Sequence, residues 1–347
     1  MKSELITPSF APVRPITRLK TRALDFVALT KPRVMLLAVF TALVGLVIAP
    51  IHLELLQGCA AIIGIATGAG AAGVLNMWYD ADIDAVMART AGRPIPSGSI
   101  SRREALAFGL VLTCVAIALL SSTTNLIAAA LLAFTIFFYI VAYTMWLKRR
   151  TPQNIVIGGA AGALPPVIGW AASTGTIGIE PIVLFLIIFL WTPPHFWALS
   201  LNRMAEYKRA GIPILPIIAG RAAATRQILT YGTLLLPASL LPWLLGFADI
   251  FYGAIALISG TFFVVLALRL HRSPQADRRA AHRLFAFSIV YLFVLFAALL
   301  ASSFNNRFFL ALSVSPTAIS SSAEESEDVS CNAIFALSPY KFGAREV

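Results

Sequence analysis

Long apolar runs recur along this chain, and shorter polar segments separate them. About 20 predominantly apolar residues in a helix are enough to cross the hydrocarbon core of a bilayer. The pattern predicts nine such helices, near residues 34–50, 55–76, 105–121, 126–146, 154–173, 181–201, 227–246, 251–268 and 284–303. We therefore expect an all-α polytopic membrane protein whose nine transmembrane helices form a bundle.

Two polar segments flank the predicted helices. Residues 1–32 are basic and lack an apolar core or a small-residue cleavage site, so we expect a retained cytoplasmic arm rather than a removable signal. Residues 33–303 form the predicted membrane domain. Residues 304–347 are Ser-rich, acidic in the middle and aperiodic, which predicts a disordered, non-cytoplasmic tail.

Composition supports membrane insertion, because 59% of the 347 residues are hydrophobic and only 12% are charged. A net charge of +11 would suggest nucleic acid as a partner for a soluble protein, but here the basic residues lie in alternate connections between spans. The connections near 51–54, 122–125, 174–180 and 247–250 contain no Lys or Arg. The positive-inside rule therefore predicts a cytoplasmic N-terminus and excludes nucleic acid as the explanation of the charge.

This orientation also places the two longest connections, residues 77–104 and 202–226, on the cytoplasmic side. Long loops in a compact bundle tend to be functional. The multi-pass pattern fits a bacterial inner membrane. The mitochondrial inner membrane stays as an alternative, because an Arg-rich N-terminus poor in acids is also typical of a presequence.

Three oxygen-bearing side chains follow the second apolar run at intervals of four residues. On an α-helix such steps advance about 40° around the axis and about 6 Å along it, so Asn76, Asp80 and Asp84 share a face and Asp82 points elsewhere. Carboxylates at a membrane edge are costly unless they are paired or bind a cation, and oxygen ligands suit Mg²⁺. The row predicts a Mg²⁺ site for a phosphorylated substrate.

Basic residues accompany this row. Arg89 and Arg93 follow it directly, and beside a metal site they can bind a diphosphate and stabilise the charge that develops as it leaves. The alternative is that they are ordinary positive-inside arginines. Lys148, in the connection after the fourth span, could reach the same diphosphate as a point charge.

The end of the sixth span carries a second polar cluster. If the second and sixth spans face each other, Glu206 can complete the cation site begun by Asp80 and Asp84; alternatively it is a solvated residue at a helix end. His195 lies between Pro194 and Phe196. It is either a hydrogen-bonded structural residue or a ligand-binding one.

Three runs together resemble the protohaem IX farnesyltransferase (haem O synthase) family of the intramembrane prenyltransferase superfamily. They are NMWYDADIDAVMARTAGRP, LKRRTPQNIVIGGAAGALPPVIGW, and WTPPHFWAL with its continuation EYKRAGIPILP. The resemblance covers roughly residues 24–303. One departure concerns the second acidic motif, where the superfamily usually has two aspartates four apart and this chain has Glu206 and Ala210.

The resemblance implies a nine-helix bundle around a central cavity that opens towards the lipid. It also implies Mg²⁺-dependent transfer of farnesyl from farnesyl diphosphate to a vinyl group of haem B, which yields haem O. Asn76, Asp80 and Asp84 would then hold metal and diphosphate with Arg89 and Arg93, and Glu206 would represent the second acidic motif. Lys148 and His195 remain candidates for binding the substrates.

Partners implied by this resemblance are haem B, farnesyl diphosphate, the bilayer, and a downstream haem A synthase or terminal oxidase assembly. Two other functions remain open. One is a prenyltransferase for an aromatic quinone precursor, and the other is a cation-coupled transporter that uses Asp80 and Asp84. The position of the acidic row at a span end disfavours the transporter, because carriers usually bind substrate near the bilayer midplane.

Overall fold

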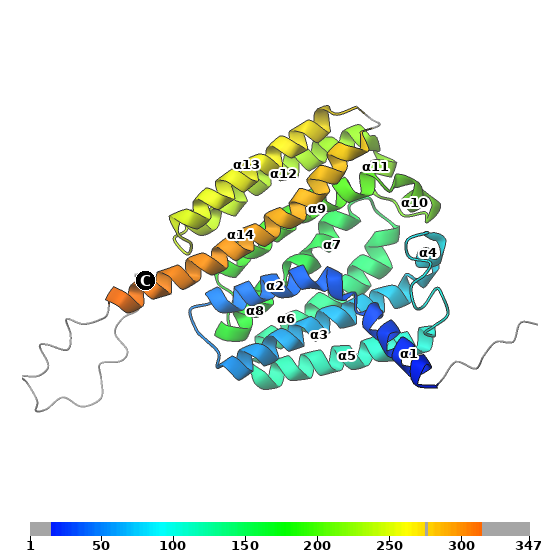
Figure 1. Cartoon of the computed structure of the whole chain (residues 1–347), viewed down its shortest axis with the longest axis horizontal. Helices are drawn as coiled ribbons and strands as arrows, with labels where there is room; N and C mark the ends of the chain where they lie inside the picture. The colour runs from blue at the N-terminus through cyan, green and yellow to red at the C-terminus, as the bar shows by residue number, and fades with distance from the viewer. Residues whose placement is uncertain (1–14, 275–276, 314–347) are drawn as a thin grey trace, which may run out of the picture. The chain divides into compact units, whose positions relative to one another are not determined.

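The computed structural model describes residues 15–274 and 277–313, and every regular element in these ranges is a helix (Figure 1). Residues 1–14 of the predicted arm and 314–347 of the predicted tail lie outside the described residues. The chain divides into a compact unit through Ser303 and a second unit from Phe304. The fold and the sites below belong to the first unit.

The first helices supply one side of the bundle. They are α1 (Pro15–Leu29), α2 (Pro32–Ile48), α3 (Leu55–Tyr79), α4 (Ala81–Val86), α5 (Arg102–Thr123) and α6 (Leu126–Phe137). Lys31 separates α1 from α2 with a left-handed backbone (φ 55°), and Pro32 begins α2 at a position where its missing N–H costs no hydrogen bond. The described part of α1 and α2 therefore meet at a bend of 48°.

Helix α6 changes geometry where it approaches the polar end of the bundle. It continues as a π-helix, η1 (Phe138–Trp146), and ends in the 3₁₀ turn η2 (Leu147–Arg149). The helices α7 (Asn154–Ala163) and α8 (Pro165–Thr174) then follow, separated at Leu164 because Pro165 and Pro166 cannot continue the hydrogen-bond ladder. π-helical segments occur frequently at functional sites, and η1 contributes to the cavity described below.

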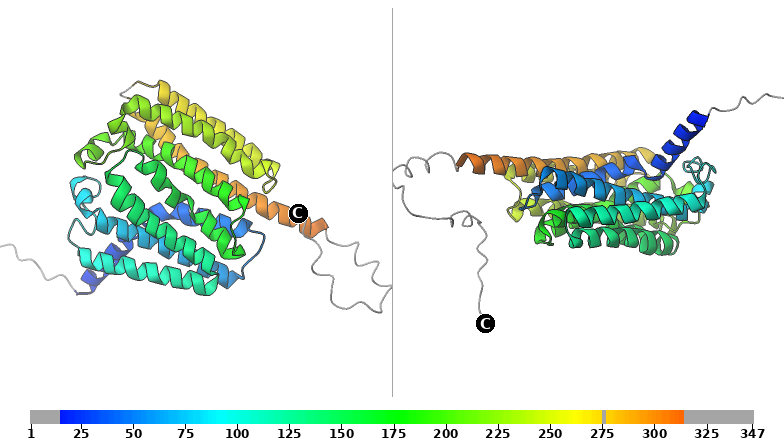
Figure 2. Two further views of the ribbon diagram at one scale, coloured as in Figure 1. Left: turned by 180° about the vertical axis from the view of Figure 1, so that it is seen from behind. Right: turned by 90° about the horizontal axis from the view of Figure 1, so that it is seen from below.

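The second half of the unit contains α9 (Ile179–Leu201), α10 (Met204–Arg209), α11 (Leu215–Ile218), α12 (Gly220–Leu244), α13 (Ile250–Arg272) and α14 (Arg278–Ser313). Helix α12 packs against both α9 and α13, and α3 packs against α5. The view from behind keeps α12 and α13 side by side (Figure 2).

The prediction of nine spans is not confirmed. Among the described residues, seven helices are long and apolar enough to cross a membrane, and the bent pair formed by α1 and α2 raises the number to eight. The remaining predicted span corresponds to α12, which is long enough but contains Pro237 and Pro242 and is less apolar than α9 and α13. The all-α membrane architecture itself is confirmed.

The last predicted span, residues 284–303, corresponds to the candidate membrane span Arg278–Phe304, and α14 itself runs on to Ser313. The first residues of the predicted tail are therefore helical. Extending an existing helix costs much less than nucleating a new one, so the helix continues through residues that would not start one.

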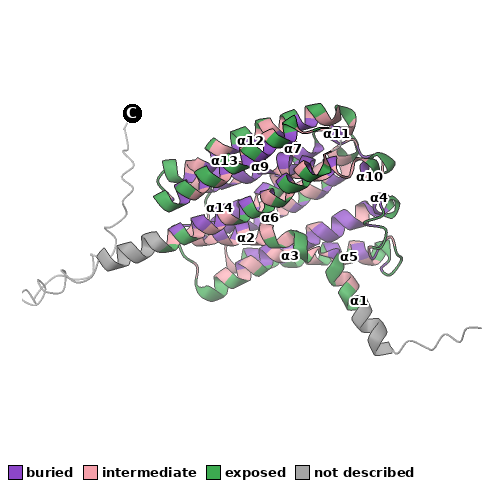
Figure 3. Ribbon diagram, turned by 45° about the horizontal axis from the view of Figure 1, so that its top comes forward, coloured by how far each residue is buried: buried purple, intermediate pink, exposed green. Residues whose placement is uncertain are grey.

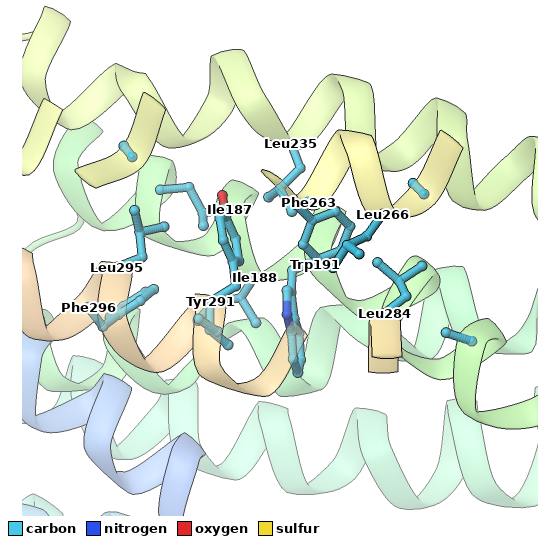
Figure 4. Packing of buried hydrophobic residues seen from close by; sticks show 14 of the residues in the cluster. Ile187, Ile188, Trp191, Leu235, Phe263, Leu266, Leu284, Tyr291, Leu295 and Phe296 are labelled. Carbon is cyan, nitrogen blue, oxygen red and sulfur yellow. The ribbon is translucent and has the colours of Figure 1, made fainter. Parts of the chain in front are cut away.

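Apolar side chains cover the outer surfaces of this unit as well as its interior. Leu55, Leu126 and Ile258 are 85%, 76% and 71% exposed, which suits helices that face hydrocarbon rather than water (Figure 3). Inside, the largest buried cluster joins α9, α12, α13 and α14 through residues such as Ile187, Phe263 and Tyr291 (Figure 4).

A smaller buried cluster connects the two long polar loops. Ile83 and Met87 from the first loop pack against Tyr207, Ile212 and Ile214 from the second. We call these five residues the loop seam. The seam holds the ends of the second and sixth predicted spans together, an arrangement that the sequence left open, and it forms part of the wall of the cavity that follows.

Candidate active site

A polar cavity of about 120 Å³ lies beneath the two loops, where α3, η1 and α9 end and α7 begins. Six of the residues singled out in the sequence line it, namely Asn76, Asp80, Asp84, Arg89, Arg93 and Lys148. Together with Lys31, the lining contains four basic side chains and two carboxylates. The cavity is therefore suited to an anion of high charge, especially if a cation accompanies it.

The three-residue row survives a break in the helix. Helix α3 ends at Tyr79, yet the Asp80 N–H donates to the Asn76 carbonyl (2.9 Å) and the Asp84 N–H donates to the Asp80 carbonyl (2.8 Å). These bonds keep the helical spacing of four residues, so the side chains stay on one face. All three are buried, with 5%, 2% and 5% of their surface exposed.

Asn76 lies at the centre of the hydrogen-bond network in the cavity. Its Nδ2 donates to Asp80 Oδ2 (2.9 Å) and to Thr144 Oγ1 (3.1 Å), while its Oδ1 accepts from Lys31 Nζ (2.6 Å). Thr144 Oγ1 donates in turn to the Tyr139 carbonyl within the π-helix (2.8 Å). The amide is thus held by three elements, and its oxygen faces a cation.

The two carboxylates are each paired with a base. Lys148 Nζ donates to Asp80, and Arg93 Nη1 donates to Asp84 Oδ2 at 2.6 Å. Thr90 Oγ1 donates to the Asp84 carbonyl (2.9 Å), which anchors the loop that carries Arg93. Buried carboxylates need such partners, because an isolated buried charge is strongly unfavourable.

Asp82 behaves differently from its neighbours, as the helical spacing predicted. Its two carboxylate oxygens accept from Arg149 Nη1 and Nη2, both at 2.8 Å, and it does not line the cavity. The hydrogen bond from Arg149 holds the pKa of the Asp82 carboxyl below its usual value. This ion pair therefore lies on the surface near the cavity, and it does not contact the space that a ligand would occupy.

The oxygens in the cavity fit a hard divalent cation. Asp80 Oδ1 is buried without a hydrogen-bond donor, and Arg149 Nη2 lies 3.8 Å from it. Across the described residues no three His, Cys, Asp or Glu side chains gather into a metal-binding group. Mg²⁺ characteristically binds through one or two carboxylates plus substrate phosphates and water, so two carboxylates are sufficient when a diphosphate is the substrate.

Glu206 does not line the polar cavity. It lies on α10, half-buried, next to Tyr207, and only Tyr207 lines the cavity. Successive residues on a helix point about 100° apart, so the two side chains leave α10 in different directions. Burial raises the pKa of the Tyr207 hydroxyl, which keeps this wall of the cavity neutral. A metal-binding role of Glu206 stays a prediction.

His195 lies on α9 and lines a second, larger cavity beside the first. Its ring stacks on Trp191 with the centroids 4.2 Å apart and contacts Phe285 at 4.9 Å. The structure therefore places the candidate site residues in two cavities. Six of them line the polar cavity with the acidic row, and His195 lines the apolar one.

Lys31, Tyr143 and Asn154 also line the polar cavity, and the sequence did not single them out as site residues. Lys31 reaches it from the break between α1 and α2, where Gly70 and Gly73 of α3 leave room for Thr30. A Cβ on Gly73 would lie 3.0 Å from the Thr30 carbonyl oxygen. Lys31 was counted only as part of a basic arm, and no local pattern distinguished it from the other basic residues there.

Tyr143 and Asn154 complete the wall. Tyr143 fits against Gly158, since a Cβ there would lie 2.2 Å from its ring. Asn154 Nδ2 donates to the carbonyls of Lys148 (3.2 Å) and Pro213 (3.3 Å), while its Oδ1 is buried without a donor. The Asn154 amide thus joins η2 to the second loop, a role that became apparent only in the fold.

Comparisons with known proteins agree with this architecture. Residues 38–290 match the model of the UbiA prenyltransferase family. The chain is 59% identical over 285 residues to "Protoheme IX farnesyltransferase 2" of Mesorhizobium japonicum, covering 82% of this chain and 91% of that protein. It is 58% identical over 280 residues to "Protoheme IX farnesyltransferase" of Rhizobium meliloti, covering 80% and 89%.

Solved structures show the same fold at low sequence identity. A digeranylgeranylglyceryl phosphate synthase superposes with a TM-score of 0.69 at 20% identity, covering 82% of this chain and 99% of that one. A UbiA homolog from Archaeoglobus fulgidus, bound to DMAPP and Mg²⁺, superposes with a TM-score of 0.59 at 16% identity, covering 79% and 99%.

Proposed function

The chain belongs to the UbiA prenyltransferase family, and we propose that it transfers farnesyl from farnesyl diphosphate to a vinyl group of haem B. The product would be haem O. The prenyl and haem components follow the names of the relatives that are 58–59% identical over most of the chain. The observation that carries the proposal here is the polar cavity, where buried carboxylates and an excess of basic side chains lie at the ends of apolar helices.

The acidic row would hold the metal that accompanies the diphosphate. We assign Asn76, Asp80 and Asp84 as candidate Mg²⁺ ligands, with the unpartnered Oδ1 of Asp80 as the most available atom. When bound, Mg²⁺ would neutralise charge on the diphosphate oxygens and make the diphosphate a better leaving group.

The basic residues would bind the anion itself. Lys31, Arg89, Arg93 and Lys148 line the cavity from three different segments, so they can surround a diphosphate rather than contact one face of it. Charge-assisted hydrogen bonds from fixed donors stabilise a leaving group whose negative charge increases as the C–O bond breaks. Their pairing with Asp80 and Asp84 holds Lys148 and Arg93 close to the place where that charge develops.

The rest of the wall would protect the reacting carbon. Ile83, Met87, Tyr143 and Phe196 line the cavity beside the polar groups, and they present apolar surface to the farnesyl chain. As the allylic C–O bond breaks, the vinyl carbon of haem B donates its π electrons to C1 of farnesyl and a C–C bond forms. Water adds to the resulting cation next to the porphyrin and loses a proton, which leaves a hydroxyl group. Exclusion of bulk water prevents hydrolysis of the allylic cation before the vinyl group reacts.

The multi-span chain places this reaction at a membrane surface. We propose that the cavity faces the cytoplasm of a bacterial inner membrane, because the loops that cover it carry Arg89, Arg93, Arg203 and Lys208. The product would then stay in the membrane for a downstream haem A synthase or terminal oxidase.

The direct test is conversion of haem B. Membranes that contain the full chain should form haem O when supplied with haem B, farnesyl diphosphate and Mg²⁺, as followed by chromatography and mass. Addition of EDTA should abolish the product, and excess Mg²⁺ should restore it, because the two carboxylates and the diphosphate share the metal. Membranes without the protein provide the blank. No haem O from the wild-type protein would refute the assignment.

Lys31 offers a second test of the diphosphate site. Lys31→Asn should raise the KM for farnesyl diphosphate by about tenfold, since a hydrogen bond to a charged group contributes roughly 1.5–3 kcal/mol. Asparagine tolerates the left-handed backbone at this position, so the change removes the charge with little strain. Lys208→Asn is the control, because Lys208 is exposed on the second loop and does not line the cavity. Equal KM values for the two variants would exclude Lys31 from diphosphate binding.

A further inference from the structure

A second cavity, of about 470 Å³, lies between α2, α7, α9 and α14. Its walls are mostly apolar, and the hydroxyls of its two threonines are already used within their own helices. Thr41 donates to the Ala38 carbonyl (2.9 Å) and Thr192 to the Ile188 carbonyl (2.8 Å). Two polar side chains in the lining are not satisfied in this way, His195 and Arg33. The volume is within the range of small-molecule and cofactor sites, about 300–1,000 Å³.

The hydrogen bonds of Ser288 determine the tautomer of His195. Ser288 Oγ lies 2.6 Å from the Phe285 carbonyl oxygen, a distance that requires the serine proton between the two oxygens. Ser288 Oγ also lies 2.6 Å from His195 Nδ1. Because the serine proton is already donated, Nδ1 must carry the proton of this second bond. The neutral ring therefore keeps its lone pair on Nε2, which has no partner among the described residues.

The imidazole is held in one orientation. Ser288 fixes Nδ1 through its hydroxyl, and its carbonyl also accepts from Trp191 Nε1 at 2.7 Å. Trp191, labelled in Figure 4, stacks on the His195 ring with an interplanar angle of 19°. One residue of α14 thus orients both aromatic rings on α9. A histidine whose second nitrogen is fixed by a hydrogen bond is the usual arrangement of a metal ligand.

Arg33 supplies a cation to the same cavity. It lies next to the start of α2, it is exposed, and it has no ion pair or hydrogen bond among the described residues. An occupant of this cavity would therefore be largely apolar, with a group that accepts the Nε2 lone pair and an anionic group for the guanidinium. An isoprenoid chain meets only the first of these three requirements.

Residues that are close in sequence line the two cavities. Lys31 lines the polar cavity and Arg33 lines the apolar one, on the same short segment. Likewise Phe196 lines the polar cavity and its neighbour His195 lines the apolar one. The two cavities therefore lie near each other at these two segments.

We propose that this second cavity binds the iron tetrapyrrole acceptor, with His195 Nε2 as an axial ligand of its iron and Arg33 pairing with a propionate. The inference rests on the proposed function, since haem B is the acceptor named there. Ser288 is the positioning residue, because it holds the His195 ring through Nδ1 and does not touch the iron.

The test is a spectroscopic titration of the purified full chain in lipid nanodiscs with ferric haem B. Wild type should show the absorption and EPR signature of histidine ligation, and His195→Ala should lose it; added imidazole should restore it by entering the space left by the side chain. Ser288→Ala should weaken haem binding by about tenfold or more, because the bond that orients the ring is lost. His271→Ala is the control, since His271 also bonds a hydroxyl through Nδ1 (Thr225, 3.2 Å) but lies outside the cavity.

Arg33 is tested with a modified substrate. Arg33→Gln should weaken binding of haem B by about fivefold, the range of an exposed ion pair. The same change should have no effect on binding of the haem B dimethyl ester, whose propionates carry no charge. An equal loss for both forms would show that Arg33 does not pair with a propionate.

The outcomes separate this inference from the proposed function. If wild type makes haem O but His195→Ala binds haem B with an unchanged spectrum, the axial role is wrong and the function stands. A farnesyl chain in this cavity would give that result. If wild type neither binds nor converts haem B, the proposed function fails, and the acceptor site fails with it. Mg²⁺-dependent binding of farnesyl diphosphate by His195→Ala establishes that the variant is folded.

Discussion

Replacing Asp80 by asparagine is expected to slow farnesyl transfer by about 10²-fold to 10³-fold, the largest effect on activity that the site predicts. Asparagine has nearly the same size, so the packing around this buried position is kept. What is lost is the negative charge that pairs with Lys148 and the oxygen, Oδ1, that is left free for a cation. The measurement is kcat/KM for farnesyl diphosphate at saturating haem B, across a range of Mg²⁺ concentrations.

Asp82→Asn is the matched control. Asp82 lies two residues away on the same turn, with 56% of its side chain exposed and its oxygens bonded to Arg149. The same chemical change there should leave kcat/KM within about twofold, as is usual for surface substitutions. If the two variants lose activity equally, the effect comes from the net charge of the loop and not from a metal position at Asp80.

Replacing Gly169 by alanine should cause the largest loss of stability, about 3 kcal/mol. Helices α2 and α8 cross with their backbones in contact at this residue. A Cβ on Gly169 would lie 2.0 Å from the Ala42 carbonyl oxygen, and one on Gly45 would lie 2.1 Å from the Pro166 carbonyl oxygen. Backbone atoms cannot turn aside as a flexible side chain can, so the helices must separate. Denaturant or detergent titration of the purified protein would measure the change in the free energy of unfolding.

Gly58→Ala provides the comparison within a helix. A Cβ at Gly58 would meet only Leu46 Cδ2 at 3.9 Å, an ordinary contact. Because alanine favours helix over glycine by up to about 1 kcal/mol, this variant should be as stable as wild type or slightly more so. Equal stabilities of the Gly58 and Gly169 variants would mean that α2 and α8 are not in backbone contact in the membrane.

Local spacing predicted one side of the candidate site well. The row Asn76, Asp80 and Asp84 depends only on helical periodicity, and the structure keeps that periodicity across the break at Asp80. Arg93 follows close enough in sequence for its loop to return it to Asp84. The placement of both long loops at one end came from the alternation of basic connections, which is equally a property of the sequence.

The site residues that could not be predicted come from segments that are far apart in the sequence and meet only in the fold. Lys31 reaches Asn76 only because α1 and α2 bend and because two glycines of α3 admit the bend. Asn154 follows the candidate Lys148 by six residues, but only the fold shows that its side chain joins η2 to the second loop. Glu206 is the opposite case: its loop lies at the cavity, but Tyr207 and not Glu206 lines it, and a metal-binding role of Glu206 stays a prediction. The hydrophobic pattern does not determine which of two adjacent residues on a short helix faces the cavity.

The loop seam has a consequence for the order in which the protein is made. It joins Ile83 and Met87 to residues more than a hundred positions later in the chain. The N-terminal helices can bury their own cluster early, whereas these two side chains find their partners only after Ile214 has left the ribosome. Until then Ile83 and Met87 lack their cover, and a nascent chain that stops before α10 holds the carboxylates without one wall of their cavity. Assembly of the site is therefore a late event in biosynthesis, because this wall of the cavity requires residues from both loops.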